Sequence, residues 1–326
     1  MSSILSFISL GGLTLVSFSV LLGLRRTSLF ISWLALELNL ISFIIWILRR
    51  KEEASLIIKY FLVQRIGSII FLLRILLFMF SEFSLFLIYF SLVLKLGFAP
   101  AHVWVVNILP KFSNLTIVLL ISVQKILPLF ILLRITQIWI LYFVFISGLA
   151  VGLVGALHQV CWKKIIAYSS IFSGSWLLLG ACAIYSSYFF LMIYTLGILL
   201  ILLRQGHVNN RIVLNLKLSK VSVCGFSAGL LRIAGIPPLV GFFGKIILVL
   251  ESFKAFSEFI IALIIILSIF IVYVYIRLFY NTLTSRLSSY LLNNETRFST
   301  RVLVIIILGG VIWAYVCECK HVKFWS

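Results

Sequence analysis

Long runs of apolar residues follow one another along most of the chain, and short polar connections separate them. Most runs reach the roughly 20 residues that an α-helix needs to cross a bilayer. The pattern therefore predicts an all-α membrane protein with about eleven transmembrane helices. We expect these helices at residues 4–24, 27–48, 55–80, 83–110, 114–134, 137–158, 164–185, 187–204, 221–250, 258–280 and 301–317.

The connections leave no room for a separate water-soluble domain, so we expect one polytopic membrane domain over residues 1–326. The first apolar run ends at Arg25 and Arg26 and has no positive charge before it. A secretory signal peptide carries its positive charge before the apolar run and a small-residue cleavage site after it. We therefore interpret the first run as a retained helix.

The composition supports a membrane location and argues against two other classes of function. Hydrophobic residues make up 63% of the chain and the mean hydropathy is +1.24, whereas soluble domains have about 45–50% apolar residues. The five cysteines lack metal-site spacing, so we expect no metal site. A net charge of +19 would suit nucleic-acid binding. Most basic residues lie in the connections, however, so we expect membrane lipids rather than nucleic acid as partners.

The basic residues in the connections and at the terminal positions of the predicted helices are divided unequally between the two sides of the membrane. Thirteen lie on the side that holds the N-terminus and the connections after the even-numbered helices: Arg49, Arg50, Lys51, Lys111, Lys163, Lys164, Arg204, Arg211, Lys217, Lys220, Arg286, Arg297 and Arg301. The other side has six: Arg25, Arg26, Arg134, Lys254, Lys320 and Lys323. Positive charge marks the inner side. The N-terminus is therefore predicted inside, and an odd number of helices puts the C-terminus outside.

The other eight basic residues fall inside the predicted helices, away from their terminal positions: Lys59, Arg65, Arg74, Lys95, Lys125, Arg232, Lys245 and Arg277. Lys59 and Arg277 are close enough to helix ends to reach the membrane surface. Lys95 and Lys125 each lie about ten residues, or about 15 Å, from the nearer end of their apolar run. An unpaired charge at that depth costs at least roughly 2.5–3.5 kcal/mol. These lysines therefore need a functional or structural reason.

Glu37 is the acid that lies deepest in an apolar run, midway along the second predicted helix. A carboxylate at that depth is either protonated or paired with a buried cation. One interpretation is a plain Glu–Lys ion pair that holds two helices together. That interpretation leaves the other buried lysines unexplained, whereas a proton relay uses several of them.

Four of the five prolines lie close in sequence to buried lysines: Pro100 to Lys95, Pro128 to Lys125, and Pro237 and Pro238 to Lys245. A proline cannot donate a hydrogen bond to the carbonyl four residues earlier. The carbonyls left without donors need water or polar partners, so we expect hydrated cavities there. Ordinary packing kinks are the alternative.

The two segments 97–100 and 235–238 interrupt the fourth and ninth predicted helices. These helices are five apart in the order of the chain and therefore cross the membrane in opposite directions. That arrangement is the one that inverted repeats of transporter folds require. The sequence thus predicts two broken helices in inverted-repeat positions.

Several sequence blocks occur in a specific order: Ile58–Leu62, Lys95–Trp104, Gln124-Lys125, Lys164–Ile171, Gly235–Phe242 and Arg277-Leu278. Over most of the chain they resemble the chain 2 family of mitochondrial NADH–ubiquinone oxidoreductase. The members of this family are antiporter-like subunits in the membrane arm of respiratory complex I. The resemblance implies a proton-translocating, multi-pass subunit of the mitochondrial inner membrane, with its N-terminus in the matrix and its C-terminus in the intermembrane space.

The resemblance also implies roles for the buried charges. Glu37 and Lys95 would form a carboxylate–lysine pair, Lys125 would be the central relay lysine, and Lys245 would face the neighbouring antiporter-like subunit. Burial disfavours the charged form of a lysine and a nearby carboxylate favours it. Lys95 would therefore load or release a proton as Glu37 approaches or withdraws. For His102, a relay role and a structural hydrogen bond are both open.

The family resemblance further implies that this chain is part of an enzyme, the H⁺-translocating NADH:ubiquinone reductase, without redox chemistry of its own. NADH, FMN, iron–sulfur clusters and ubiquinone would belong to other subunits of the complex, and no cofactor is expected on this chain. The expected partners are the other membrane-arm subunits.

Four residues depart from the family pattern, and one of them is Gly244, which stands where relatives usually have a proline just before the last lysine. Ser173 stands where relatives often have a histidine, and Arg65 and Arg232 occupy positions that are normally small and uncharged. A cation/proton antiporter subunit would share the buried lysines and broken helices, but its relatives usually have a fuller set of fourteen helices. A non-catalytic membrane scaffold would explain the hydropathy but not the buried charges.

Overall fold

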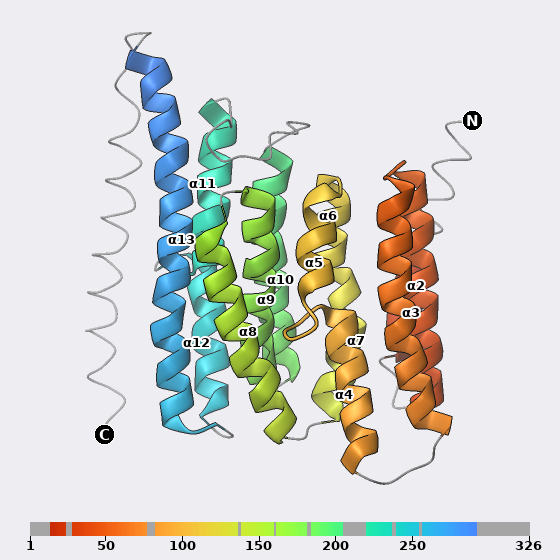
Figure 1. The fold of residues 1–326 in the computed structure, drawn as a ribbon. Coiled ribbons are helices and arrows are strands. Elements are labelled where there is room, and N and C mark those ends of the chain that lie inside the picture. Colours follow the sequence, from red (N-terminus) through yellow and green to blue (C-terminus); the bar gives the residue numbers. More distant parts are fainter. Residues whose placement is uncertain are drawn as a thin grey trace.

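The computed structural model describes residues 14–23, 28–76, 82–135, 138–159, 161–180, 184–204, 220–236, 239–253 and 256–291. In these ranges the regular structure is helical (Figure 1). A short apolar helix, Thr14–Gly23, comes first. It is followed by α2 (Leu29–Arg49), α3 (Ala54–Leu76), α4 (Glu82–Leu96), α5 (Val103–Ile108), the 3₁₀ turn η1 (Leu109–Lys111), α6 (Asn114–Ile121), α7 (Val123–Arg134), α8 (Ile138–His158), α9 (Trp162–Leu179), α10 (Ile184–Arg204), α11 (Lys220–Ala234), α12 (Val240–Ser252) and α13 (Glu258–Leu291).

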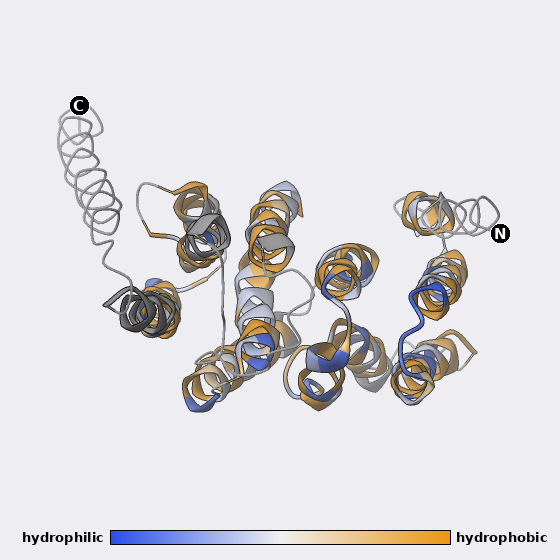
Figure 2. Ribbon diagram, turned by 90° about the horizontal axis from the view of Figure 1, so that it is seen from above, coloured by the Kyte–Doolittle hydropathy of each residue, from blue (hydrophilic) through white to orange (hydrophobic). Residues whose placement is uncertain are grey.

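Six described helical spans are long and apolar enough to cross a membrane: Leu29–Arg49, Ala54–Leu76, Asn114–Arg134, Leu141–His158, Ile184–Leu202 and Glu258–Tyr280. Large apolar side chains such as Leu21, Phe143 and Ile269 are more than half exposed, and apolar residues colour most of the helices seen end-on in Figure 2. Exposed apolar surface of this extent suits lipid rather than water. The predicted all-α membrane fold is confirmed at this level, while the predicted helix at 301–317 lies outside the described residues.

The fourth predicted helix, 83–110, is two helices in the structure. Helix α4 ends at Leu96, and α5 begins only at Val103. Gly97 between them has φ +66°, a left-handed conformation that glycine adopts without strain. A Cβ atom at Gly97 would also clash with Val105. The sequence Gly-Phe-Ala-Pro therefore ends α4 directly after Lys95 and Leu96, and Lys95 lies in the last turn of the helix.

The fifth predicted helix, 114–134, is also interrupted, at a position that the sequence did not indicate. Helices α6 and α7 meet at Ser122, which has φ −99° and ψ −82°. The Ser122 hydroxyl donates a hydrogen bond to the carbonyl of Val118 at 2.7 Å. A serine that bonds its own helix in this way competes with the backbone pattern. Pro128 lies inside α7, three residues beyond Lys125.

The ninth predicted helix, 221–250, appears as α11 and α12. Helix α11 ends at Ala234, Gly235 has φ +71°, and α12 begins at Val240. Pro237 and Pro238, the prolines expected here, lie outside the described residues. Two other boundaries differ from the prediction: α9 ends early, at Leu179, and α13 continues beyond the apolar span to Leu291.

Helices α4, α7 and α9 pack in the middle of the described fold, and α4 and α7 carry the buried lysines Lys95 and Lys125. Helix α4 packs against α3, α7 and α8, and α7 also packs against α2, α6 and α10. Helix α9 lies against α8, α10, α12 and the short α5. Figure 1 shows α2 and α3 at one end of the row and α12 and α13 at the other. Helices α4, α7 and α9 therefore connect the N-terminal and C-terminal parts of the described fold.

Hydrogen bonds between connections show which helix ends share a side of the molecule. Glu52, after α2, accepts a hydrogen bond from the backbone N–H of Ser113 at 2.9 Å, at the start of α6. The Lys163 ammonium at the start of α9 donates to the carbonyl of Phe112 at 3.1 Å. The Asn114 amide donates to the carbonyl of Leu202 near the end of α10 at 3.1 Å. The connections after the second, fourth, sixth and eighth predicted helices thus meet on one side.

Arg277 has a structural role that the sequence did not indicate. Its guanidinium group, on α13, donates to the carbonyl of Leu157 at 3.0 Å and to that of Gln159 at 3.2 Å. These carbonyls lie at the C-terminal end of α8, where the last turn lacks backbone donors. The sequence predicts that Arg277 reaches the membrane surface, which stays a prediction; in the structure its guanidinium caps the end of a neighbouring helix.

Candidate functional site

Glu37 forms an ion pair between helices α2 and α3. It lies on the buried face of α2, and its Oε2 accepts a hydrogen bond from Nη1 of Arg65, on α3, at 2.8 Å. The Glu37 side chain is 9% exposed and that of Arg65 is 42% exposed. The second carboxylate oxygen, Oε1, is buried and has no hydrogen-bond partner within the described structure. Arg65, which the sequence left unexplained, is thus the observed partner of Glu37.

Lys95 is buried in the last turn of α4, with 6% of its surface exposed. The structure describes both Lys95 and Glu37 and shows no ion pair between them. Two side chains complete the end of α4. Gln64, on α3, donates to the carbonyl of Lys95 at 3.2 Å, and the Trp104 indole, on α5, donates to the carbonyl of Leu94 at 3.0 Å. Gln64 replaces a backbone partner that the end of a helix lacks. Trp104 adds a second donor to the carbonyl of Leu94, which also accepts a hydrogen bond from the backbone N–H of Gly97 at 3.2 Å. The carboxylate–lysine pair itself stays a prediction.

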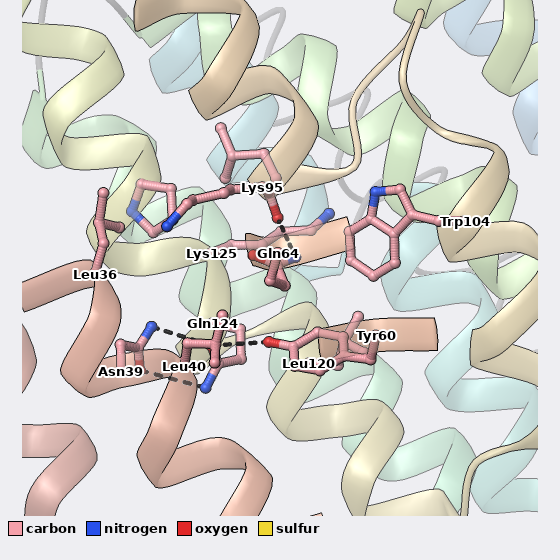
Figure 3. A pocket seen from close by; sticks show the side chains of 12 residues that line it. Leu36, Asn39, Leu40, Tyr60, Gln64, Lys95, Trp104, Leu120, Gln124 and Lys125 are labelled. Atoms are coloured by element: carbon pink, nitrogen blue, oxygen red, sulfur yellow. Dashed lines mark hydrogen bonds between the residues drawn. The ribbon is translucent and has the colours of Figure 1, made fainter. Parts of the chain in front are cut away.

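A cavity lies between Lys95 and Lys125, and both lysines belong to its wall (Figure 3). Its volume is about 20 Å³, and one buried water needs roughly 10–15 Å³. The wall consists of Leu36, Asn39, Leu40, Tyr60, Gln64, Lys95, Leu96, Trp104, Leu120, Gln124, Lys125 and Pro128. The cavity therefore has both the room and the polar groups that a buried water requires.

Three polar side chains interact along one part of the cavity wall, as the dashed lines in Figure 3 show. The Asn39 amide on α2 donates to Oε1 of Gln124 on α7 at 3.0 Å, and the Gln124 amide donates back to Oδ1 of Asn39 at 3.3 Å. The Tyr60 hydroxyl donates to the same Gln124 oxygen at 3.5 Å. The sequence pattern includes Gln124 only as part of a motif and does not single out Asn39 or Tyr60. Asn39 could have been noticed from the sequence, because it is a polar residue within an apolar helix and lies only two residues from Glu37.

Lys125 binds α9 rather than an acid. Its ammonium group, on α7 and 4% exposed, donates to the carbonyl of Ser170 at 3.0 Å. It also lies 5.2 Å from the centre of the Phe98 ring, which follows α4, within the range of a cation–π interaction. The Ser173 hydroxyl donates to the same Ser170 carbonyl at 3.1 Å. Ser173, the position at which the family resemblance leads us to expect a histidine, therefore lies next to the Lys125 contact.

Lys245 caps the end of a helix. Its ammonium group, on α12, donates to the carbonyl of Ala234, the last residue of α11, at 2.7 Å. A cation at the C-terminal end of a helix is favoured both by the unpaired carbonyls and by the helix dipole. The same ammonium group lies 5.6 Å from the centre of the Trp176 ring, on α9. Lys245 is thus held where α11 ends.

Helix α9 connects the surroundings of Lys125 with those of Lys245. Ser170 binds Lys125 and Trp176 lies beside Lys245, and six residues of helix correspond to about 9 Å. On the same helix, the Ser169 hydroxyl lies 3.0 Å from the Tyr194 hydroxyl of α10. The structure thus shows a polar contact of α9 with α10, one residue from the Lys125 contact, that was not found from the sequence.

His102 and Arg232 contribute less to this arrangement. The Nδ1 atom of His102 lies 3.1 Å from the carbonyl of Pro100, and His102 is not part of the cavity wall. Its observed contact is therefore local to the turn between α4 and α5, and a relay role for it stays a prediction. Arg232 is partly buried near the end of α11, and nothing in the described structure explains its charge.

Comparisons with known proteins identify the family. Residues 78–271 match the family model described as "NADH:quinone oxidoreductase/Mrp antiporter, TM". The NADH-ubiquinone oxidoreductase chain 2 of Artemia franciscana is 36% identical over 234 residues, which are 70% of this chain and 75% of that protein. The chain 2 of Anopheles gambiae is 30% identical over 331 residues, covering 92% of this chain and 95% of that protein.

A solved structure shows the same fold. A chain of respiratory complex I from Thermus thermophilus with bound Aureothin superposes with a TM-score of 0.74 at 20% identity, over 91% of this chain and 74% of that chain. The sequence relatives, which are much more similar, decide the family. This chain belongs to the NADH:quinone oxidoreductase/Mrp antiporter family and, within it, to the NADH-ubiquinone oxidoreductase chain 2 proteins.

Proposed function

We propose that this chain moves protons across the mitochondrial inner membrane as a membrane-arm subunit of respiratory complex I, through a relay formed by Glu37, Lys95, Lys125 and Lys245. The cavity between Lys95 and Lys125 is the observation that carries this proposal. It has room for water and lies among helices long and apolar enough to span a membrane. Water between two buried amines is a path along which a proton can pass.

The first step of the relay takes place at Lys95. Burial disfavours the ammonium form of Lys95, and an approaching Glu37 carboxylate favours it. Lys95 therefore takes up a proton when the carboxylate is close and gives it up when the carboxylate withdraws. The capping of α4 by Gln64 and Trp104 supports this step, because the Lys95 side chain is then not needed to complete the helix.

The second step is transfer through the cavity to Lys125. Two ammonium groups that share one small cavity repel each other, so Lys95 passes its proton on while Lys125 is a neutral amine, and Lys95 is left neutral after the transfer. At Lys125, the carbonyl of Ser170 and the ring of Phe98 stabilise the charged form. The next charge carrier is Lys245, whose ammonium group contacts the ring of Trp176 on α9.

The proposed arrangement in the membrane has about eleven spans, with the breaks at Gly97 and Gly235 in inverted-repeat positions. The basic connections that meet on one side would face the matrix together with the N-terminus, and the C-terminus would face the intermembrane space. The contact between Glu52 and Ser113 and that between Lys163 and Phe112 support a common side for these connections. The partners would be neighbouring membrane-arm subunits, and the redox cofactors of the complex would remain on other subunits.

The test compares two lysine variants in complex I assembled with this chain. Lys125→Met removes the amine beside the cavity, and we expect proton pumping per oxidised NADH to fall at least several-fold. Lys59→Met is the matched control, because Lys59 is an exposed lysine on α3, outside the cavity wall. Undiminished pumping by an assembled Lys125→Met complex would refute the relay.

A cation/proton antiporter subunit is the second candidate, since the matching family model also includes Mrp antiporters. The two functions differ in what drives the protons. A complex I subunit pumps only when NADH is oxidised, whereas an antiporter exchanges protons for a cation gradient without NADH. Cation-dependent proton exchange by membranes that contain this chain, in the absence of NADH, would favour the antiporter.

A further inference from the structure

Arg65 is a fixed positive charge at the beginning of the proposed relay. Its guanidinium group binds Glu37 at 2.8 Å, and an arginine does not lose its proton in proteins. Arg65 therefore cannot carry protons itself. Any effect that it has on the relay must act through Glu37.

The contacts around Arg65 hold its helix firmly against α2. The Ser68 hydroxyl, one turn further along α3, donates to the carbonyl of Arg65 at 2.9 Å. The carbonyl of Ser68 in turn accepts a hydrogen bond from the indole of Trp33 on α2 at 3.1 Å. Trp33 lies one turn before Glu37 on the same helix. The backbones on both sides of the ion pair are thus connected by a second contact, which limits how far Arg65 can move away.

Helix α3 contacts both members of the predicted carboxylate–lysine pair through adjacent residues. Arg65 binds the Glu37 carboxylate, and Gln64 binds the carbonyl of Lys95. Glu37 has one carboxylate oxygen on Arg65, while the other is buried without a partner in the described structure. The carboxylate therefore has capacity for a second donor, and the charged groups that interact with it in the described helices are Arg65 on α3 and Lys95 on α4.

We propose that Arg65 is an alternative counter-ion that holds the Glu37 carboxylate ionised and away from Lys95 while Lys95 has no proton. When Lys95 takes up a proton, it competes with Arg65 for the carboxylate. Arg65 is thus a positioning residue, and this inference rests on the proposed relay. Its physical basis is that a buried carboxylate without a cation is strongly disfavoured, so Glu37 needs a partner in both states of Lys95.

Removal of Arg65 leaves Lys95 as the remaining cation that Glu37 is proposed to pair with. Glu37 would then either hold Lys95 in its charged form or take up a proton, and either result blocks the exchange. We expect Arg65→Gln to lower proton pumping at least several-fold in assembled complex I. Arg65→Lys keeps a cation on α3 and is expected to retain more than half of the pumping. Arg74→Gln, the same substitution further along α3, is the matched control and should retain pumping.

A double-mutant cycle distinguishes action through Glu37 from a merely structural role. In a Glu37→Gln background there is no carboxylate for Arg65 to position, so adding Arg65→Gln should cause no further loss of pumping. An additional loss of the same size as in the native background would overturn the inference, as would normal pumping by Arg65→Gln alone. If Arg65→Gln fails to assemble, the Arg65→Lys complex decides: a loss as large as that of Glu37→Gln would overturn the inference.

The same set of variants separates this inference from the proposed function. If Glu37→Gln pumps normally, the relay role of Glu37 itself is wrong, whatever Arg65 does. If Glu37→Gln loses pumping but Arg65→Gln does not, the relay stands and only the role of Arg65 fails. Pumping is measured per amount of assembled complex, so that lower assembly does not count as lower activity.

Discussion

The two helix breaks at Gly97 and Gly235 have similar sequences but place their lysines differently. After α4, the carbonyls of Leu94 and Lys95 receive hydrogen bonds from Trp104 and Gln64, and the Lys95 side chain lies in the wall of a cavity. After α11, the ammonium group of Lys245 itself binds the carbonyl of Ala234. One lysine lies beside a completed helix end, whereas the other completes the helix end.

This difference suggests different tasks for the two lysines. Lys95 can change its charge without disturbing α4, because side chains from α3 and α5 hold the end of that helix. A change of charge at Lys245 alters the hydrogen bond that completes α11, so proton transfer there is coupled to the structure of the break. We expect the first break to serve fast exchange with water in the cavity, and the second to transmit a change of shape between α11 and α12.

The two glycines at the breaks give the largest expected effect. Both have positive φ, so alanine costs about 1–2 kcal/mol at either position. At Gly97 the added Cβ would also clash with Val105, whereas at Gly235 the nearest atom is the movable Nζ of Lys245, at 3.0 Å. We therefore expect Gly97→Ala to reduce the amount of assembled complex I more than Gly235→Ala does, as measured on native gels. Equal assembly of the two variants would show that the crowding at the first break has no consequence.

Replacement of each lysine by methionine should separate the two breaks by stability. Lys245→Met leaves the carbonyl of Ala234 without its donor, which costs roughly 1–3 kcal/mol for a buried group. Lys95→Met removes a buried amine, but the end of α4 keeps its hydrogen bonds from Gln64 and Trp104. The Lys245→Met complex should therefore inactivate at a lower temperature than the Lys95→Met complex, and the reverse order in thermal inactivation would contradict the comparison.

A smaller effect is expected from Gln64, which caps the first break. Gln64→Leu removes the donor to the Lys95 carbonyl, and the loss of one such hydrogen bond costs about 0.5–1.5 kcal/mol. Trp104 still binds the neighbouring carbonyl of Leu94. We expect a modest fall in thermal stability, with assembly retained. Failure of this variant to assemble would mean that the end of α4 depends on Gln64 far more than one hydrogen bond explains.

The positions of most described helices could be predicted, because the length of an apolar run corresponds to the length of the helix that it forms. Gly97 and Gly235 also marked their breaks, since only a glycine adopts a positive φ easily and proline ends a hydrogen-bond ladder. The interruption at Ser122 was missed because a single serine within an apolar run is common in membrane helices. The early end of α9 at Leu179 was missed for a similar reason, as apolar residues continue beyond it.

The candidate site was only partly predictable. The depth of Glu37, Lys95 and Lys125 in their apolar runs marked them as unusual, because buried charge is costly. The pairing of Glu37 with Arg65 could not be read from one sequence, because it depends on how α2 and α3 rotate and slide against each other. The same limit applies to Arg277, whose partners lie on a helix more than a hundred residues earlier.

The central claim is that Lys95 gains and loses a proton in each cycle, and replacement by arginine tests it most directly. Arginine keeps a positive charge near Glu37 but does not release its proton, while methionine removes the charge. NADH-driven proton pumping would be measured in matched amounts of assembled Lys95→Arg and Lys95→Met complexes. We expect both variants to be strongly impaired. A Lys95→Arg complex that pumps well beside an inactive Lys95→Met complex would contradict the account, because a permanent charge would then suffice.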